Sequence, residues 1–184
     1  GGVYFHRMHR QALADTVRAL VMFDEANARG VSVVGEIYPY NYGASIVGAD
    51  YLKPDNYGPN MGRDYGDIIE TATLKPLTKD RYDELMQTDP KTSIMFYAAT
   101  DDDMTAGLLH PSSVVGSDAF PLNVSETGEM ARDWDTPYEA VQGHPRTAGS
   151  AARVLRWARE NPDLSLSDAI SKMSYKVASF LERN

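Results

Sequence analysis

The sequence contains no cysteine, and this absence excludes two kinds of protein. A domain stapled by disulfides is ruled out, and so is a zinc site built on thiolates. Histidine, aspartate and glutamate side chains remain as the available metal ligands. A chain without cysteine is compatible with a reducing compartment, and we expect a cytoplasmic protein.

Basic charge and long apolar runs are also scarce. Lys and Arg number 18 against 26 Asp and Glu, a net charge of −8, whereas binding to a phosphate backbone requires a concentrated cationic face. No apolar run approaches the roughly 18 residues that cross a bilayer, and the first residues lack the pattern of a signal peptide. We therefore expect neither a nucleic-acid partner nor a membrane partner. Because no initiator Met is present, we expect an excised piece of a longer protein.

The motifs of several enzyme classes are missing as well. The sequence has no Gly-x-Ser-x-Gly, no phosphate-binding loop and no Gly-x-Gly-x-x-Gly. A serine or cysteine hydrolase, a kinase and a Rossmann dehydrogenase are therefore not expected. The composition itself, with 42% hydrophobic and 24% charged residues, is that of an ordinary globular protein.

Helical and strand patterns alternate along the chain. Leu13, Val17, Leu20 and Val21 form the apolar stripe of an amphipathic helix. Residues 31–38 form an apolar run typical of a strand that is buried on both faces, as in parallel sheets. Further patterns predict helices at 65–72, 78–89, 100–110, 147–160 and 165–173, and strands at 93–98 and 112–116. This order predicts an α/β fold of parallel βα units in a single domain over residues 1–184, either half of an eight-stranded barrel or a small open sheet.

Two long segments, 39–63 and 119–149, lack periodicity and are predicted to be functional or mobile loops. Both begin at the C-terminal ends of predicted strands, where chemistry gathers in barrels and in open α/β sheets. Asp118 is the leading candidate there, because a carboxylate that follows an apolar strand can bind a metal or accept a proton from water. An N-cap or turn Asp is the alternative. Glu36 is a weaker candidate, either paired within the sheet or directed at a barrel centre.

The histidines give three further candidates. His6 and His9 could share a metal ion, or they could be surface residues in a basic string. His144 and Arg146 could hold a substrate carboxylate, which Arg binds in a bidentate manner. His110 is predicted to interact with a helix C-terminus, and the acids at 101–103 to occupy a first helical turn rather than a cation site.

Four segments, in order, resemble the C-terminal half of the D-aminoacylases, which are N-acyl-D-amino-acid deacylases of the amidohydrolase superfamily. The segments are 28–40, 114–118, 143–149 and 166–174. The resemblance implies the second half of a (β/α)8 barrel and hydrolysis of an amide C–N bond by zinc-activated water. The implied substrate is a small N-acyl amino acid or a related amide.

The resemblance also implies roles for individual residues. Asp118 matches the family's general base and proton shuttle, and Tyr38 matches a tyrosine close to the substrate. His144 and Arg146 match a His-Pro-Arg motif that is structural or close to the substrate. The implied metal ligands are His6, His9 and Asp118.

Departures from the family pattern limit what the chain is expected to do alone. Arg7 stands where many relatives have a metal-binding His, so either His6 or His9 replaces that ligand or the metal site is weakened. The segment 41–45 is one residue out of step, which leaves a substrate role for Ser45 in doubt. The family's His-x-His, its bridging ligand and its β-sandwich have no counterpart. We therefore expect an inactive fragment that self-associates through exposed sheet edges; the alternative is a non-catalytic α/β domain that binds a partner or a small ligand.

Overall fold

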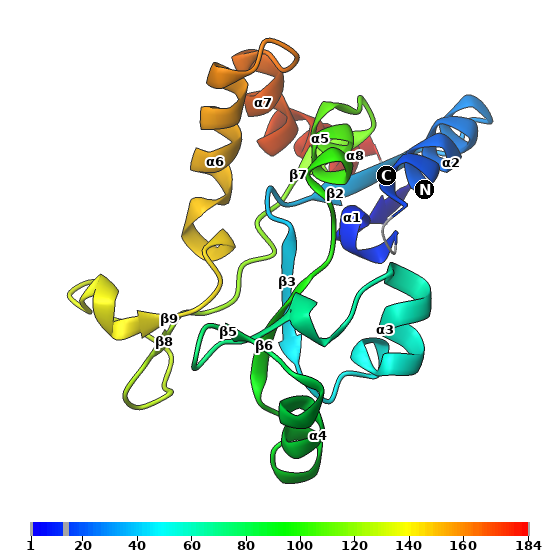
Figure 1. Ribbon diagram of the computed structural model, residues 1–184. Helices are drawn as coiled ribbons and strands as arrows, with labels where there is room; N and C mark the ends of the chain where they lie inside the picture. The colour runs from blue at the N-terminus through cyan, green and yellow to red at the C-terminus, as the bar shows by residue number, and fades with distance from the viewer. Residues whose placement is uncertain (1, 13–14, 184) are drawn as a thin grey trace. The chain divides into compact units, whose positions relative to one another are not determined.

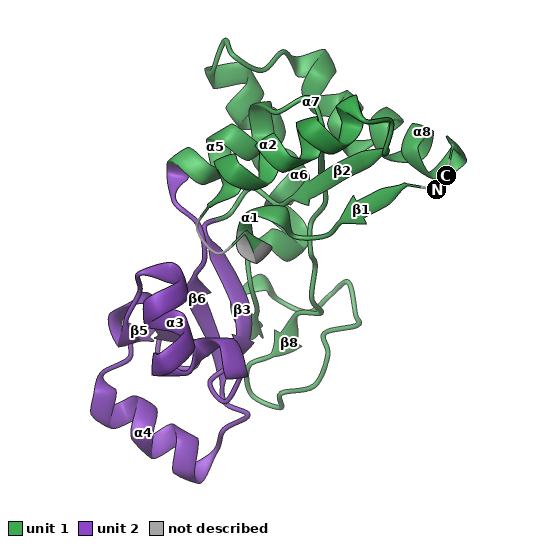
Figure 2. Ribbon diagram, turned by 90° about the vertical axis from the view of Figure 1, so that its right-hand side faces the viewer, with its two compact units in different colours: residues 1–40, 102–184 green, residues 41–101 purple. Residues whose placement is uncertain are grey.

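The computed structural model describes residues 2–12 and 15–183 (Figure 1). They divide into two compact units, one of residues 1–40 and 102–184 and the other of residues 41–101 (Figure 2). The chain thus comprises a discontinuous unit and a unit inserted into its sequence, and the single domain expected over residues 1–184 stays a prediction. None of the described helices is long and apolar enough to cross a membrane.

The first unit is built on a parallel sheet in the order β1-β2-β7. Its strands are β1 (Val3–Phe5), β2 (Val33–Ile37) and β7 (Ser113–Val115). Its helices are α1 (Met8–Gln11), α2 (Thr16–Ala28), α5 (Asp101–Leu109), α6 (Arg146–Glu160), α7 (Leu166–Met173) and α8 (Tyr175–Arg183), the first residue of α5 belonging to the second unit. The predicted α/β fold with parallel strands is confirmed.

The two faces of β2 differ in what covers them. Val33 and Ile37 each belong to an apolar cluster, the first with Met8, Leu20 and Phe23 and the second with residues of α5, α6 and α7. Because side chains alternate along a strand, Glu36 lies on the opposite face. β2 therefore packs one side against helices and presents a carboxylate on the other.

Helix α2 is present where it was predicted, but the predicted buried face is wrong. Val17 is 59% exposed and Val21 is 52% exposed, and Leu13 lies outside the described residues. The buried stripe is Thr16, Leu20 and Phe23, which also fits the helical repeat. Packing of the large Phe23 ring against β2 selects this face.

The segment 119–149 has little regular structure, as predicted. Its short elements are β8 (Asn123–Val124), the 3-10 helix η3 (Tyr138–Ala140) and β9 (Val141–Gln142), and β8 pairs with β9 in an antiparallel manner. The mobility of this segment stays a prediction. So does self-association, although all three residues of β1 are exposed.

The second unit contains an antiparallel sheet in the order β3-β6-β4-β5. Its elements are β3 (Tyr42–Ile46), η1 (Asp50–Leu52), α3 (Pro54–Met61), η2 (Tyr65–Asp67), β4 (Ile68–Glu70), β5 (Lys75–Pro76), α4 (Lys79–Thr88) and β6 (Ser93–Tyr97). Buried apolar side chains from these elements, among them Val47, Leu52, Ile68, Ile94 and Phe96, form its core.

Three predictions for this region are wrong. Residues 39–63 are not a loop, because they contain β3 and α3. Residues 65–72 do not form one helix, because only Tyr65–Asp67 is helical, as the 3-10 helix η2, and Ile68–Glu70 is a strand that pairs with β6. The strand at 93–97 does not extend the parallel sheet, because it pairs in an antiparallel manner on both sides.

Candidate active site

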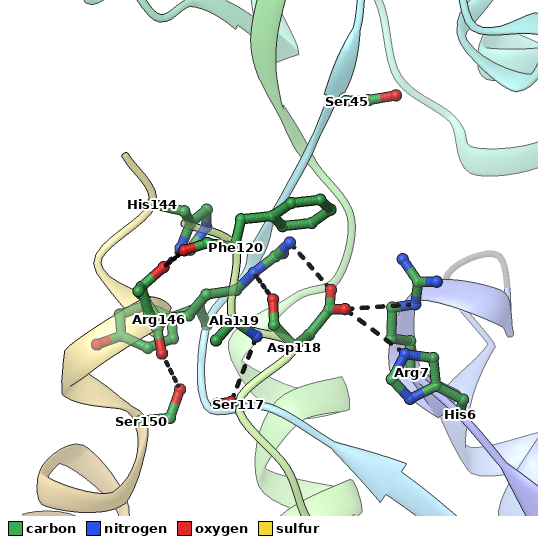
Figure 3. A network of polar contacts seen from close by, with 12 residues as sticks. His6, Arg7, Ser45, Ser117, Asp118, Ala119, Phe120, His144, Arg146 and Ser150 are labelled. Atoms are coloured by element: carbon green, nitrogen blue, oxygen red, sulfur yellow. Dashed lines mark hydrogen bonds and ion pairs between the residues drawn. The ribbon is translucent and has the colours of Figure 1, made fainter. Parts of the chain in front are cut away.

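Five polar side chains meet beyond the C-terminal ends of the parallel strands of the first unit. They form the strand-end cluster: His6, Arg7, Glu36, Asp118 and Arg146 (Figure 3 shows all but Glu36 labelled). Parallel strands bring residues far apart in sequence to the same edge. His6 and Arg7 follow β1, Glu36 lies in β2, Asp118 follows β7 and Arg146 opens α6.

Asp118 is the centre of the cluster. Its Oδ2 lies 3.0 Å from Nη2 of Arg146, and its Oδ1 lies 3.5 Å from Nε2 of His6 and 3.6 Å from Nε of Arg7. Its backbone is in the left-handed region, with φ of 48°, and the residues after it are not helical. The N-cap alternative is therefore wrong, and the carboxylate is largely buried among cationic groups.

Glu36 holds the other side of the His6 ring. The Nδ1 atom of His6 contacts Oε2 of Glu36, whose residue is 6% exposed. A Cβ on Gly116 would collide with this carboxylate, so the glycine leaves the space that it occupies. Burial, together with the charge of Glu36 and a hydrogen bond to it, raises the pKa of the Tyr4 hydroxyl above its ordinary value.

Arg146 is completely buried and contacts Asp118 twice. In addition to the ion pair, its Nε donates to the carbonyl oxygen of Asp118 at 2.8 Å. Its guanidinium carbon lies 4.8 Å from the centroid of the Tyr38 ring and 5.3 Å from that of Phe120. The buried guanidinium thus contacts Asp118, and the predicted role of Arg146 in binding a substrate carboxylate stays a prediction.

Tyr38, His144 and His9 are also buried. The His9 ring packs against Tyr38 at 4.3 Å between centroids, and its Nε2 lies 3.3 Å from the carbonyl oxygen of Tyr40. His144 packs edge-on against Tyr40, and its Nδ1 accepts from the backbone N–H of Arg146 at 3.1 Å. Tyr38 and His144 thus pack beside Arg146, and His9 packs against Tyr38. Substrate binding by Tyr38 and His144 stays a prediction.

The remaining candidate residues, His110 and the acids at 101–103, lie outside the strand-end cluster. The Nε2 atom of His110 lies 3.1 Å from Oδ2 of Asp24. Asp101 accepts from the Asn41 side chain, and Asp103 accepts from the backbone N–H of Thr16. In the second unit, the Ser45 hydroxyl lies 2.5 Å from that of Tyr51. These contacts give His110 and the two acids positions typical of structural residues.

The described residues do not form a complete metal site. Within 2–12 and 15–183, no group of three or more His, Asp or Glu side chains is arranged to hold a metal ion. His6 and Asp118 supply two neighbouring donors, whereas catalytic zinc takes three protein ligands. Arg7 stays protonated and brings a positive charge close to Asp118. Of the predicted ligands His6, His9 and Asp118, the structure brings His6 and Asp118 together, and metal binding by this set stays a prediction.

This geometry predicts that the isolated chain does not retain zinc. After incubation with zinc and desalting, we expect substoichiometric metal by mass spectrometry, because two donors beside two guanidinium groups bind a dication weakly. His6→Ala should leave that value unchanged. Stoichiometric zinc in the unaltered chain, lost in His6→Ala, would contradict the prediction.

The backbone matches solved deacylases over nearly the whole chain. A D-aminoacylase mutant in complex with CuCl2 superposes with a TM-score of 0.67 at 18% identity, covering 99% of this chain and 36% of that one. This chain has part of the D-aminoacylase fold. A second D-aminoacylase structure gives a TM-score of 0.63 at 20% identity over 98% of this chain and 36% of its own. The N-acyl-D-glutamate deacylase from Bordetella bronchiseptica, complexed with zinc and a phosphonate inhibitor, gives 0.65 at 22% identity over 98% and 35%.

The resemblance to D-aminoacylases predicted from the sequence is thus confirmed at the level of the fold. No family model and no curated protein matches the sequence. The chain spans about 36% of the length of the D-aminoacylases that it matches. Its likeness is to part of an amidohydrolase barrel protein.

Proposed function

We propose that this chain is part of a metal-dependent amidohydrolase that hydrolyses the amide bond of an N-acyl amino acid. The observation that carries the proposal is the position of Asp118. In part of a D-aminoacylase fold, this carboxylate lies beyond a parallel strand beside a histidine and two arginines. Amide hydrolysis needs a group that takes a proton from water and returns one to the departing amine.

Asp118 is the proposed carrier of that proton. A carboxylate can accept the proton of the attacking water at one oxygen and deliver it to the amine nitrogen as the C–N bond breaks. Arg146 holds Oδ2 and the backbone carbonyl, which leaves Oδ1, on the side of His6 and Arg7, for this exchange. Removal of the surrounding water strengthens each of these electrostatic contacts.

Arg7 is the proposed contact for the substrate carboxylate. Its side chain is 27% exposed, whereas that of Arg146 has no exposure. A partly exposed guanidinium can bind a carboxylate through two parallel hydrogen bonds. In the whole protein, zinc would supply Lewis-acid chemistry, and its ligands beyond His6 and Asp118 would have to come from polypeptide outside this chain.

The experiment is an assay of the whole protein carrying Asp118→Asn. We expect kcat for hydrolysis of N-acyl-D-amino acids, with zinc present, to fall about a hundredfold or more, because an amide cannot carry the proton. Asp163→Asn, at an exposed position, is the matched control and should keep full activity. Undiminished turnover in Asp118→Asn would remove the proposed mechanism.

A further inference from the structure

Glu36 is a buried acid in the central strand of the parallel sheet. β2 pairs with β1 on one side and β7 on the other, and Glu36 is 6% exposed there. Withdrawing a carboxylate from water costs free energy unless partners compensate for it. The buried Glu36 carboxylate therefore needs specific partners, and two neighbouring residues lie on the same face of the sheet.

The register of the sheet brings both partners to Glu36. Tyr4 pairs with Val34, so that Tyr4 and Glu36, two residues beyond Val34, point to the same face. Burial, and after it the proximity of the Glu36 carboxylate, raise the pKa of the Tyr4 hydroxyl. His6 follows two residues after Tyr4, and its Nδ1 contacts the Glu36 carboxylate.

This contact selects one tautomer of His6. Ionised carboxylates only accept hydrogen bonds, and the His6 ring has one on each side. The contact of Nδ1 with Glu36 is a hydrogen bond, whereas Asp118 lies 3.5 Å from Nε2, so a neutral imidazole keeps its proton on Nδ1. The Nε2 atom then carries the lone pair and faces Oδ1 of Asp118 at 3.5 Å. A histidine whose second nitrogen is held by a carboxylate presents a fixed ring orientation and a more basic lone pair.

We infer that Glu36 is a positioning residue that fixes His6 in the Nδ1–H tautomer, which leaves the unprotonated Nε2 on the side of Asp118. The inference rests on the proposed function, because the tautomer of His6 matters for catalysis only if Asp118 and His6 belong to the active site. Tyr4 anchors the Glu36 carboxylate from the neighbouring strand. Gly116 is the fourth component, because any side chain at that position would displace the carboxylate.

The test measures the tautomer directly. Long-range ¹H–¹⁵N correlation spectra of the ¹⁵N-labelled chain at about pH 8.5, above the ordinary pKa of histidine, distinguish protonated from unprotonated ring nitrogens. The sequence has four histidines, and the His6 signals are identified by their loss in His6→Gln. We expect His6 to be mainly Nδ1–H in the unaltered chain.

Two variants remove the contact by different means. Glu36→Leu deletes the acceptor, and Gly116→Ala displaces it while keeping the charge. Both should convert His6 to mainly Nε2–H, whereas Glu36→Gln keeps an acceptor oxygen and should retain the original tautomer. Glu139→Leu, at an exposed position, is the control and should change nothing.

The inference is overturned if His6 is mainly Nε2–H in the unaltered chain, or if it stays Nδ1–H in both Glu36→Leu and Gly116→Ala while their backbone spectra remain dispersed. These spectra do not depend on turnover. If His6 has the expected tautomer but Asp118→Asn is fully active, only the proposed function is wrong. If Asp118→Asn loses activity but His6 does not have the expected tautomer, only the positioning role of Glu36 is wrong.

Discussion

Replacing Arg146 by methionine should lower the free energy of unfolding of the first unit by about 3 to 5 kcal/mol, the usual cost of removing one partner of a buried ion pair. Methionine fills much of the same volume but leaves Oδ2 of Asp118 without its ion-pair partner at 3.0 Å and the Asp118 carbonyl oxygen without its donor at 2.8 Å. It also removes the cation from the face of the Tyr38 ring. Loss of the nearest cation to the buried Asp118 carboxylate accounts for most of the expected decrease.

Urea unfolding followed by the fluorescence of Trp157 measures this effect. Trp157 packs against the cluster that contains Ile37 and Val154, so it reports on the first unit. Arg156→Met is the matched control, because the Arg156 side chain is 71% exposed and its ion pair with Glu160 lies on the surface; surface pairs contribute about 0 to 1 kcal/mol.

A double variant separates the ion pair from the packing. Arg146→Met combined with Asp118→Leu should be less destabilised than the sum of the two single variants, since removing both partners leaves no buried charge. A loss below about 1 kcal/mol in Arg146→Met, the size of a single neutral hydrogen bond, would show that Asp118 does not depend on this guanidinium.

The parallel strands were predictable because burial on both faces leaves a strong signal. The apolar runs around β2 and β7 have few polar interruptions, and such runs are typical of strands covered by helices. The N-termini of two helices, α4 and α7, were also predictable. The helices predicted at 78–89 and 165–173 begin after Thr78 and Ser165, whose side chains accept from the backbone N–H groups of Arg81 and Asp168, as threonine and serine commonly do at this position.

The second unit was not predictable by the same reasoning. β3 (Tyr42–Ile46) contains glycine, serine and tyrosine, which resemble a loop composition, and its pairing with β6 depends on residues about fifty positions later. β4 and β5 span three and two residues, too short to show alternation. Long-range pairing, rather than local preference, determines these strands.

The candidate site was predictable in its location and only partly in its contacts. Asp118 was selected because it follows an apolar strand and His6 because a histidine can bind a metal ion, and parallel topology brings them together. The burial of Arg146 against Asp118, and the contact of Glu36 with His6, required the three-dimensional register. The sequence contained one signal of the contact between Glu36 and His6. Glu36 interrupts an otherwise apolar strand, and a buried acid needs a partner.

Lys172 gives the second large effect, a dependence of stability on pH. It lies in the last turn of α7, is 2% exposed and donates to the carbonyl oxygens of His110 and Ser113 and to the Ser113 hydroxyl. Burial, reinforced by the charge of Lys176 and opposed by that of Asp168, lowers the pKa of Lys172 to about 7. In the unfolded chain the ordinary value is about 10.4.

The sign follows from which state binds the proton more tightly. Between about pH 7 and 10.4 the unfolded chain keeps a proton on Lys172 that the folded chain releases, so stability rises with pH across this window. Below about pH 7 both states are protonated, and this contribution is constant at its least favourable value. The rise from pH 7.5 to 9.5 should be about 2 to 3 kcal/mol, and the whole window is worth on the order of 4 kcal/mol.

Urea unfolding at pH 7.5 and pH 9.5 checks this expectation, with the comparison made between variants because other groups also titrate. Lys172→Met should lose the rise, because methionine carries no group that titrates. Lys91→Met, at an exposed position, should keep the rise. An equal rise in Lys172→Met and the unaltered chain would show that Lys172 stays charged in the fold, stabilised by its three acceptors.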